Sequence, residues 1–171
     1  MAHGSTDDRR RKRRVRLPRR PTDASATPAR LGELQINRSV SHGLIHLGDT
    51  YYLSGLGTHA PSTIEYAVPP GFDRFEAVVG VSRYAKGNGS VVVSVHLDGV
   101  EVFKSDLLTG KDAPITVTIP LHGAKKLTLK TDATPDGKKH DHVDFALAGF
   151  AKTRPTTAPV AAPPDTPASD R

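Results

Sequence analysis

The sequence predicts an all-β protein, and three observations carry this prediction. Apolar and polar residues alternate with a period of two in six separate stretches, as they do in strands that bury one face. Turn sequences rich in Gly, Pro, Asn and Asp separate these stretches. No stretch of the central region has the apolar spacing of an amphipathic helix. Many short strands in one domain favour a β-sandwich or jelly roll.

The six stretches give the expected strands in chain order. Between the third strand and the residues after it, Asp98-Gly99 predicts a two-residue hairpin. Other expected turns lie at 69–71, 86–89, 121–123 and 135–138. The apolar residues of the stretches are Ile64, Tyr66 and Val68; Phe75, Ala77, Val79 and Val81; Val91, Val93, Val95 and Leu97; Ile115, Val117 and Ile119; Leu127 and Leu129; and Val143, Phe145 and Leu147.

The chain of 171 residues divides into one domain and two tails. Residues 1–30 contain ten Lys or Arg against three Asp and almost no large apolar residue, which predicts a disordered basic tail. Residues 31–151 form the expected sandwich. Residues 152–171 are rich in Pro, Thr and Ala, which predicts a disordered linker or tail. Residues 31–150 hold eleven basic and thirteen acidic residues, so the folded part does not resemble a nucleic-acid surface.

Several classes of function lack their sequence signals. The chain has no cysteine, which excludes a disulfide framework, a thiolate zinc site and a thiol nucleophile. No apolar run approaches the length of a membrane span, and no apolar segment follows the basic run 9–14 as it would in a secretory signal. Nucleophile-elbow, phosphate-loop and zinc-enzyme motifs are missing, so we expect no enzyme activity.

Six sequence motifs, in one order, resemble the NPCBM/NEW2 domain, which is carbohydrate-binding module family 51. The motifs are RSVSHGLIHLG (38–48), YYLSGLGTHAPSTIEY (51–66), FDRFEAVVGV (72–81), GSVVVSVHLDGVEVFKS (89–105), GAKKLTL (123–129) and DGKKHDHVDF (136–145). The resemblance implies a β-sandwich of the galactose-binding-like jelly-roll kind. It also implies a non-catalytic module for galactose-type or related glycans, attached to or beside a glycoside hydrolase or cell-surface domain, such as a family 98 enzyme. An extracellular or cell-surface location follows from the same resemblance.

The same motifs suggest a sugar site. Carboxylates accept hydrogen bonds from sugar hydroxyls, imidazoles donate or accept them, and an aromatic ring packs against a pyranose. Each candidate also has a structural interpretation, as a core residue or a loop cap. No cofactor is firmly implied; calcium is the ion that the weak metal candidates Asp132, Asp136 and Asp141 would suit. The candidate sugar ligands are His59, Tyr84, Asp141, His142, Asp144 and Phe145.

Two positions depart from the family pattern. Phe145 stands where the family usually has Trp, and Ser82 where it often has Asp. These departures leave open an alternative function, in which a structural or protein-interaction sandwich has lost the sugar site. A second alternative is binding of nucleic acid or another polyanion through the Arg-rich residues 9–20.

Overall fold

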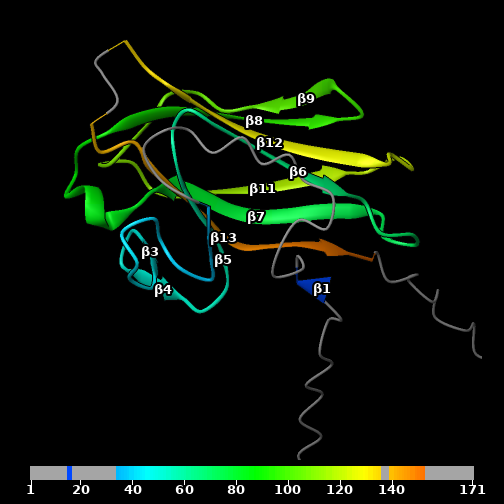
Figure 1. Ribbon diagram of the computed structural model, residues 1–171, viewed down its shortest axis with the longest axis horizontal. Helices are drawn as coiled ribbons and strands as arrows, with labels where there is room; N and C mark the ends of the chain where they lie inside the picture. Colours follow the sequence, from blue (N-terminus) through cyan, green and yellow to red (C-terminus); the bar gives the residue numbers. More distant parts are fainter. Residues whose placement is uncertain (1–14, 17–33, 136–138, 153–171) are drawn as a thin grey trace, which may run out of the picture.

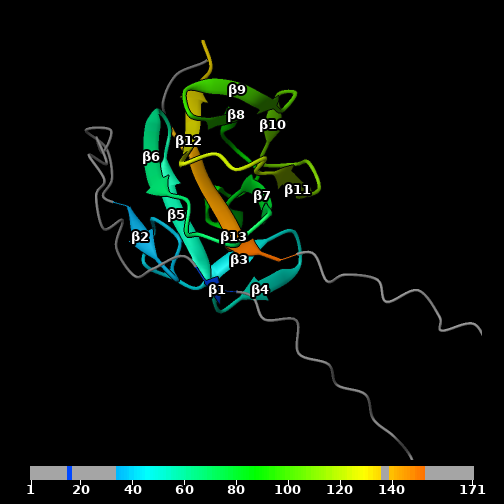
Figure 2. The same cartoon turned by 90° about the vertical axis from the view of Figure 1, so that its right-hand side faces the viewer.

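The computed structural model describes residues 15–16, 34–135 and 139–152. Within these residues, two antiparallel sheets face each other (Figures 1 and 2). The first sheet has the strand order β11-β7-β13-β5-β2, with β1 also pairing with β13, and the second has the order β10-β8-β12-β6, with β9 also pairing with β8. The expected all-β sandwich is therefore confirmed.

Six of the observed strands correspond to the six expected alternating stretches, and the other, mostly shorter strands were not among them. The first sheet contains β1 (Val15–Arg16), β2 (Gln35–Ile36), β5 (Gly55–His59), β7 (Arg74–Val81), β11 (Ile115–Pro120) and β13 (His142–Ala151). The second contains β6 (Ser62–Ala67), β8 (Ser90–Leu97), β9 (Val100–Lys104), β10 (Leu108–Thr109) and β12 (Lys126–Ala133). A small hairpin, β3 (Ile45–Leu47) with β4 (Thr50–Tyr52), and a short 3₁₀ helix, η1 (Arg83–Ala85), complete the described elements.

The tails expected from composition lie mostly outside the described residues. Val15 and Arg16 are exceptions within residues 1–30, because they pair with Phe150 and Gly149 of β13. Lys152 is the one described residue of the expected C-terminal linker, and the polyanion-binding candidates 9–20 are described only at 15–16. In the described part of the chain, no helix is long and apolar enough to cross a bilayer.

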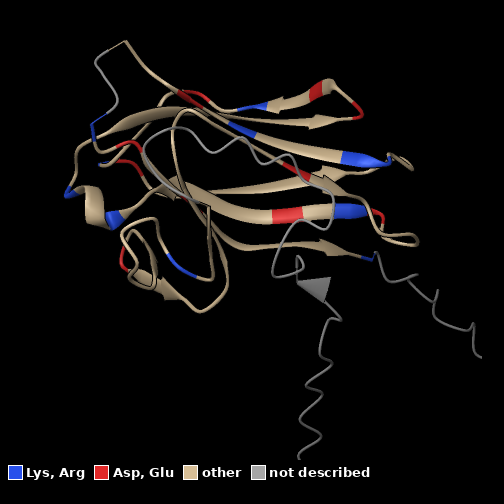
Figure 3. Ribbon diagram, in the orientation of Figure 1, with Lys and Arg blue, Asp and Glu red and all other residues tan. Residues whose placement is uncertain are grey.

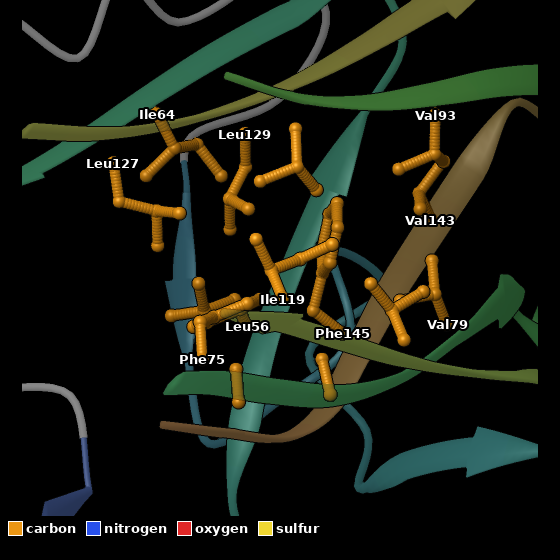
Figure 4. Close-up of a cluster of buried hydrophobic side chains, with 14 of the residues drawn as sticks. Leu56, Ile64, Phe75, Val79, Val93, Ile119, Leu127, Leu129, Val143 and Phe145 are labelled. Atoms are coloured by element: carbon orange, nitrogen blue, oxygen red, sulfur yellow. The ribbon is translucent and has the colours of Figure 1, made fainter. Parts of the chain in front are cut away.

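The core lies between the two sheets and is made by the inward side of each alternating stretch (Figure 4). Period-two alternation puts every second side chain on this side, so burial there removes apolar surface from water. Phe75, Phe145 and Phe150 are its largest fully buried side chains. The buried residues labelled in Figure 4 are Leu56, Ile64, Phe75, Val79, Val93, Ile119, Leu127, Leu129, Val143 and Phe145.

One predicted core residue is wrong. Leu147 was expected to continue the inward side of β13 but is 36% exposed, while Ala148 is buried. The pairing of β13 with β7 shifts register between Ala146 and Gly149, and Leu147 has a left-handed φ of 54°. This β-bulge reverses the side on which the following residues point, which simple alternation does not anticipate.

The expected hairpin at Asp98-Gly99 is confirmed as the connection of β8 to β9. Both residues have positive φ, 48° and 89°, as a two-residue turn of this hand requires. The Asp98 carboxylate also accepts hydrogen bonds from the backbone amides of Lys125 and Lys126, at 3.0 and 2.8 Å. This turn fixes the end of the sandwich opposite the candidate site.

The β3–β4 hairpin covers the outer face of the first sheet (Figure 1). Ile45 and Leu47 of β3 pack against Ala146 of β13 and form a second, smaller apolar cluster. Consequently the residues of β13 that point away from the main core are still buried, which decides the environment of one candidate site residue.

Candidate functional site

Four of the six candidate sugar ligands lie where β5, β13 and β7 meet at one end of the first sheet. They are His59, Tyr84, Asp141 and His142. His142 is the register partner of His59, and Val143 is that of Val81. The amide of Ser82 donates to the carbonyl of His142 at 2.8 Å, which places η1 and Tyr84 directly beyond it. We call this region the histidine end: loop 38–43, His59, Tyr84 and residues 140–142.

His59 occupies a structural position at this end. Its side chain is 6% exposed, and its Nδ1 lies 2.7 Å from the carbonyl oxygen of Ala60, as a donor. Its ring centroid lies 5.3 Å from that of His142. The imidazole therefore closes the end of β5 and presents little surface to a ligand.

His142 is half-buried and lies beside the loop. Its Nδ1 is 3.1 Å from the hydroxyl of Ser41. Burial, followed by the nearby imidazoles of His59 and His140, lowers the pKa of His142. The ring is therefore neutral near pH 7 and offers both a donor and an acceptor nitrogen. The exposed ring of His140 lies 6.4 Å from it, between centroids.

Asp141 is buried and links three strands through hydrogen bonds. Its side chain is 1% exposed, and its Oδ1 accepts a hydrogen bond from the backbone amide of Ser90 at 3.1 Å. Its carbonyl accepts the amide of Ala60 at 2.9 Å. These contacts join the start of β13 to the end of β5 and the start of β8, which matches the loop-capping interpretation.

Asp144 is sealed beneath loop 38–43. It lies on the outer side of β13 between Gly57 of β5 and Gly80 of β7, and it has no exposed surface. Burial raises the pKa of Asp144 to about 6, and the hydroxyls of Ser82 and Ser39 and the amide of His46 partly oppose this. The two hydroxyls also bond each other, at 3.0 Å.

Phe145 was predicted to contact the sugar, but it lies in the main core. Its ring is 1% exposed and belongs to the main core, between the two sheets (Figure 4). A platform for a sugar must be open to solvent, so Phe145 leaves the set of proposed contacts. Its replacement of the family's usual Trp therefore concerns packing.

Tyr84 has the exposed ring that Phe145 lacks. It is 37% exposed on η1, whose Ala85 is fully buried and holds the turn in place. A Cβ added at Gly43 would lie 2.5 Å from the Tyr84 ring, so the ring covers this glycine closely. His46 lies edge-on to Tyr84 at 6.3 Å and stacks on Tyr51 at 3.9 Å, between ring centroids.

Asp132 and Asp141, the weak metal candidates within the described residues, belong to no cluster that could hold a metal. Asp132 is exposed on β12, Asp141 is buried against Ser90, and Asp136 lies outside the described residues. Among residues 34–135 and 139–152, no group of three His, Asp or Glu side chains has the arrangement of a metal site.

The seating of loop 38–43 explains two of the sequence motifs. Arg38 donates from Nη1 to the carbonyl of His42 at 2.9 Å and closes the loop, while Ser39 bonds Ser82 beneath it. The loop passes so near β5 that a Cβ at Gly57 would lie 2.3 Å from the carbonyl oxygen of Arg38. The second glycine of the GLGTHA motif is therefore required by backbone approach.

Gly57→Ala is expected to lower the free energy of unfolding by about 2–3 kcal/mol, because backbone atoms cannot rotate away from the added methyl. The loop should also lift, which would break the contact of Ser41 with His142. Denaturant unfolding and the histidine NMR signals measure the two effects. Gly80→Ala is the matched control, since its Cβ would come no closer than 3.3 Å to its nearest neighbour, the end of the Leu47 side chain. Equal stability losses for both variants would contradict this explanation.

Sequence reasoning missed the loop residues at this end. Ser41, His42 and His140 are exposed polar residues in irregular segments, where no periodic pattern marks them. Ser39 and the departing residue Ser82 are buried under the loop, at 0% and 1% exposure. Position 82 therefore contacts Asp144 and the loop, and it does not face solvent.

Comparison with known proteins decides the family. The profile of the NPCBM/NEW2 domain matches residues 19–151. The chain belongs to the NPCBM/NEW2 family. A Clostridium perfringens module described as CBM51 from GH95, in complex with methyl-galactose, is 33% identical, with a TM-score of 0.70 over 74% of this chain and 92% of that one. The module CBM51-2 of C. perfringens ZmpB, in complex with GlcNAc, is 30% identical with a TM-score of 0.70, over 75% of this chain and 29% of that one.

The curated relatives are much longer than this NPCBM chain. A Renibacterium salmoninarum protein named "Putative endo-alpha-N-acetylgalactosaminidase" is 36% identical over 120 residues, which is 70% of this chain and 8% of that protein. Family membership confirms the galactose-binding-like sandwich and identifies the chain as a carbohydrate-binding module. It leaves the contacting residues to be argued from the geometry.

Proposed function

We propose that this NPCBM domain is a non-catalytic module that binds a galactose-type sugar at the histidine end. The proposal rests on one observation. This chain is similar, over 92% of the other module's length, to a module described in complex with methyl-galactose. The residues proposed to contact the sugar are those exposed or half-buried here: Ser41, Tyr84, His140 and His142.

These groups suit a neutral pyranose. The hydroxyl of Ser41 and the imidazoles of His140 and His142 can form hydrogen bonds with adjacent sugar hydroxyls. The exposed part of the Tyr84 ring can pack against the apolar face of the sugar. His59, Asp141 and Asp144 act behind this surface, by holding the strand ends and the loop that present it. Because few groups are exposed, we expect weak affinity.

The carboxylates at this end support binding without catalysis. Glycoside hydrolysis ordinarily uses two carboxyl groups that flank the scissile bond. Asp141 is 1% exposed and holds the Ser90 amide, and Asp144 has no exposed surface. Neither of these two carboxylates is therefore accessible to a sugar in solution.

The proposal extends to the setting of the module. Because this chain spans only 8% of a curated relative, we propose that such domains sit in or beside a larger glycoside hydrolase or cell-surface protein. Its glycan target then implies an extracellular or cell-surface location. Binding would keep the neighbouring activity close to its substrate, which raises the effective concentration.

Tyr84→Ala is expected to weaken binding of methyl-galactose about tenfold, because the aromatic contact is lost. His142→Asn should weaken it as well, while both variants keep the wild-type unfolding midpoint within a few degrees. Titration calorimetry or NMR titration of the full chain measures the affinity. His122→Asn is the matched control, since His122 is an exposed histidine in the turn after β11, at the opposite end.

Two results would contradict the proposal. One is a folded chain that binds neither methyl-galactose nor N-acetylated hexosamines at millimolar concentration. The other is equal affinity for Tyr84→Ala, His142→Asn and wild type, which would move the site away from the histidine end while keeping the module's function.

A further inference from the structure

A groove of about 750 Å³ borders the histidine end at η1, whose Arg83 lines the groove. Three segments form its walls: the β3–β4 turn at 48–49, η1 with the turn that follows it at 83–87, and the β10–β11 connection at 110–114. Val81, at the end of β7, lies at its base. We call it the cationic groove, because Arg83, Lys86 and Lys111 line it.

The walls of the groove are held by backbone contacts. The amide of Gly110 donates to the carbonyl of Gly89 at 3.2 Å, and a Cβ at Gly110 would lie 2.4 Å from the carbonyl oxygen of Asn88. Asn88 in turn donates from its side-chain amide to the carbonyl of Ala85 at 3.2 Å. The second and third walls therefore touch directly, so the groove is formed before any ligand arrives.

The cations of the groove are available to a ligand. Arg83, Lys86 and Lys111 are exposed, and within the described residues none of their side chains has an ion pair or hydrogen bond. Figure 3 shows the blue segments of this region on the turn between β7 and β8. They contrast with a folded part that carries eleven basic and thirteen acidic residues in all.

Two acidic residues, Asp49 and Asp112, also line the groove. Asp112 is committed to its own turn, because its Oδ2 accepts both the amide and the hydroxyl of Thr109 at 2.7 Å. These two bonds, the hydroxyl first, lower the pKa of Asp112. Asp112 therefore stabilises the turn that carries Lys111. In total, three cationic and two acidic side chains line the groove.

Aromatic residues border the groove toward the histidine end. Consecutive residues of η1 serve both regions, since Arg83 lines the groove and Tyr84 covers Gly43 of the loop. His46 and Tyr51 lie on the hairpin whose turn, at Gly48 and Asp49, forms the first wall. A saccharide chain that leaves the Tyr84 ring toward this side would meet the cations next.

We infer that the cationic groove binds the anionic group, a carboxylate or a sulfate, of an acidic saccharide joined to the galactose-type residue. This inference rests on the proposed function, because the neutral residue must occupy the histidine end. Arg83 supplies a planar fork of donors for an oxyanion, and Lys86 and Lys111 supply point charges. The module would then prefer acidic glycans to neutral ones.

Affinities of the full chain for three ligands test this: a neutral galactoside, its sialylated form and its sulfated form. The acidic ligands should bind about fivefold more tightly at low salt, and less so as salt rises. Arg83→Gln with Lys111→Gln should remove that preference and leave the neutral affinity unchanged. Lys104→Gln with Lys125→Gln is the control of equal charge change, at exposed positions outside the groove.

Each outcome is decisive. Loss of preference in the groove variant alone supports the inference, and the sialylated and sulfated ligands show which anion is used. Equal affinity for neutral and acidic ligands overturns the inference and leaves the proposed function standing. An equal drop in both double variants assigns the preference to overall charge and also overturns it. If no ligand binds to the folded chain, the proposed function and the inference fail together.

Discussion

Phe145→Ala is expected to lower the free energy of unfolding by about 3–5 kcal/mol, the range for removing a buried phenylalanine ring. Phe145 is paired in register with Leu56 of β5 and Val79 of β7, and its ring is 1% exposed. Alanine would leave a cavity in the middle of the core. Neighbouring strands hold the backbone on both sides, so the cavity could collapse only in part.

Chemical unfolding in urea measures this loss, and Phe145→Leu separates packing from sugar contact. Leucine keeps most of the buried volume, so it should cost about 1–1.5 kcal/mol and leave galactoside affinity unchanged. Tyr84→Ala should show the opposite pattern, with little loss of stability and a loss of affinity. A stable Phe145→Leu protein that no longer binds sugar would return position 145 to the site.

The free energy of unfolding is expected to decrease as the pH rises from about 4 to about 6, because Asp144 must then ionise while it is buried. Its pKa is raised from 3.8 to about 6 in the folded chain, by burial first of all. The folded state therefore holds its proton to higher pH than the unfolded state does, and stability decreases as pH rises through this window. A shift of about two pKa units corresponds to roughly 3 kcal/mol.

Asp144→Asn removes this ionisation and should abolish that part of the pH dependence. Unfolding free energies of both proteins, measured from pH 4 to 8, give the difference directly. The comparison of the two proteins is needed because His142 has the opposite effect. Its pKa is lowered in the folded state, so the protein loses stability as the pH falls below the pKa that this histidine has in the unfolded chain. Asp112→Asn is the control. The pKa of Asp112 is lowered in the folded state, so this substitution should change the pH dependence in the direction opposite to Asp144→Asn. Parallel curves for Asp144→Asn and wild type would contradict the assignment.

The core was predictable because burial on one face imposes a period of two. Ile64, Val79, Val93 and Leu129 lie inside as the alternation requires. The prediction fails at Leu147, where a β-bulge inserts an extra residue. The apolar residues up to Leu147 still alternate, and only Phe150, five positions after Phe145, is out of phase with them.

The candidate site was predictable as a location and less so as a surface. The motifs around His59 and His142 do meet, because β5 and β13 are register partners. Their burial could not be read from residue type, since a histidine or aspartate looks the same whether it caps a strand or meets a ligand. Asp144 shows this most clearly: it faces away from the main core, and only the β3–β4 hairpin and loop 38–43 make it buried.

The sequence by itself determined the fold class, the six alternating strands and the family resemblance, all of which depend on local periodicity and on motifs in a fixed order. Only the tertiary structure decided which motif residues are accessible. It placed Phe145 in the core, closed loop 38–43 over Asp144, and assembled the cationic groove from three segments distant in the chain. The physical reason is that accessibility and convergent charge depend on how separate segments pack, and no single segment encodes that packing.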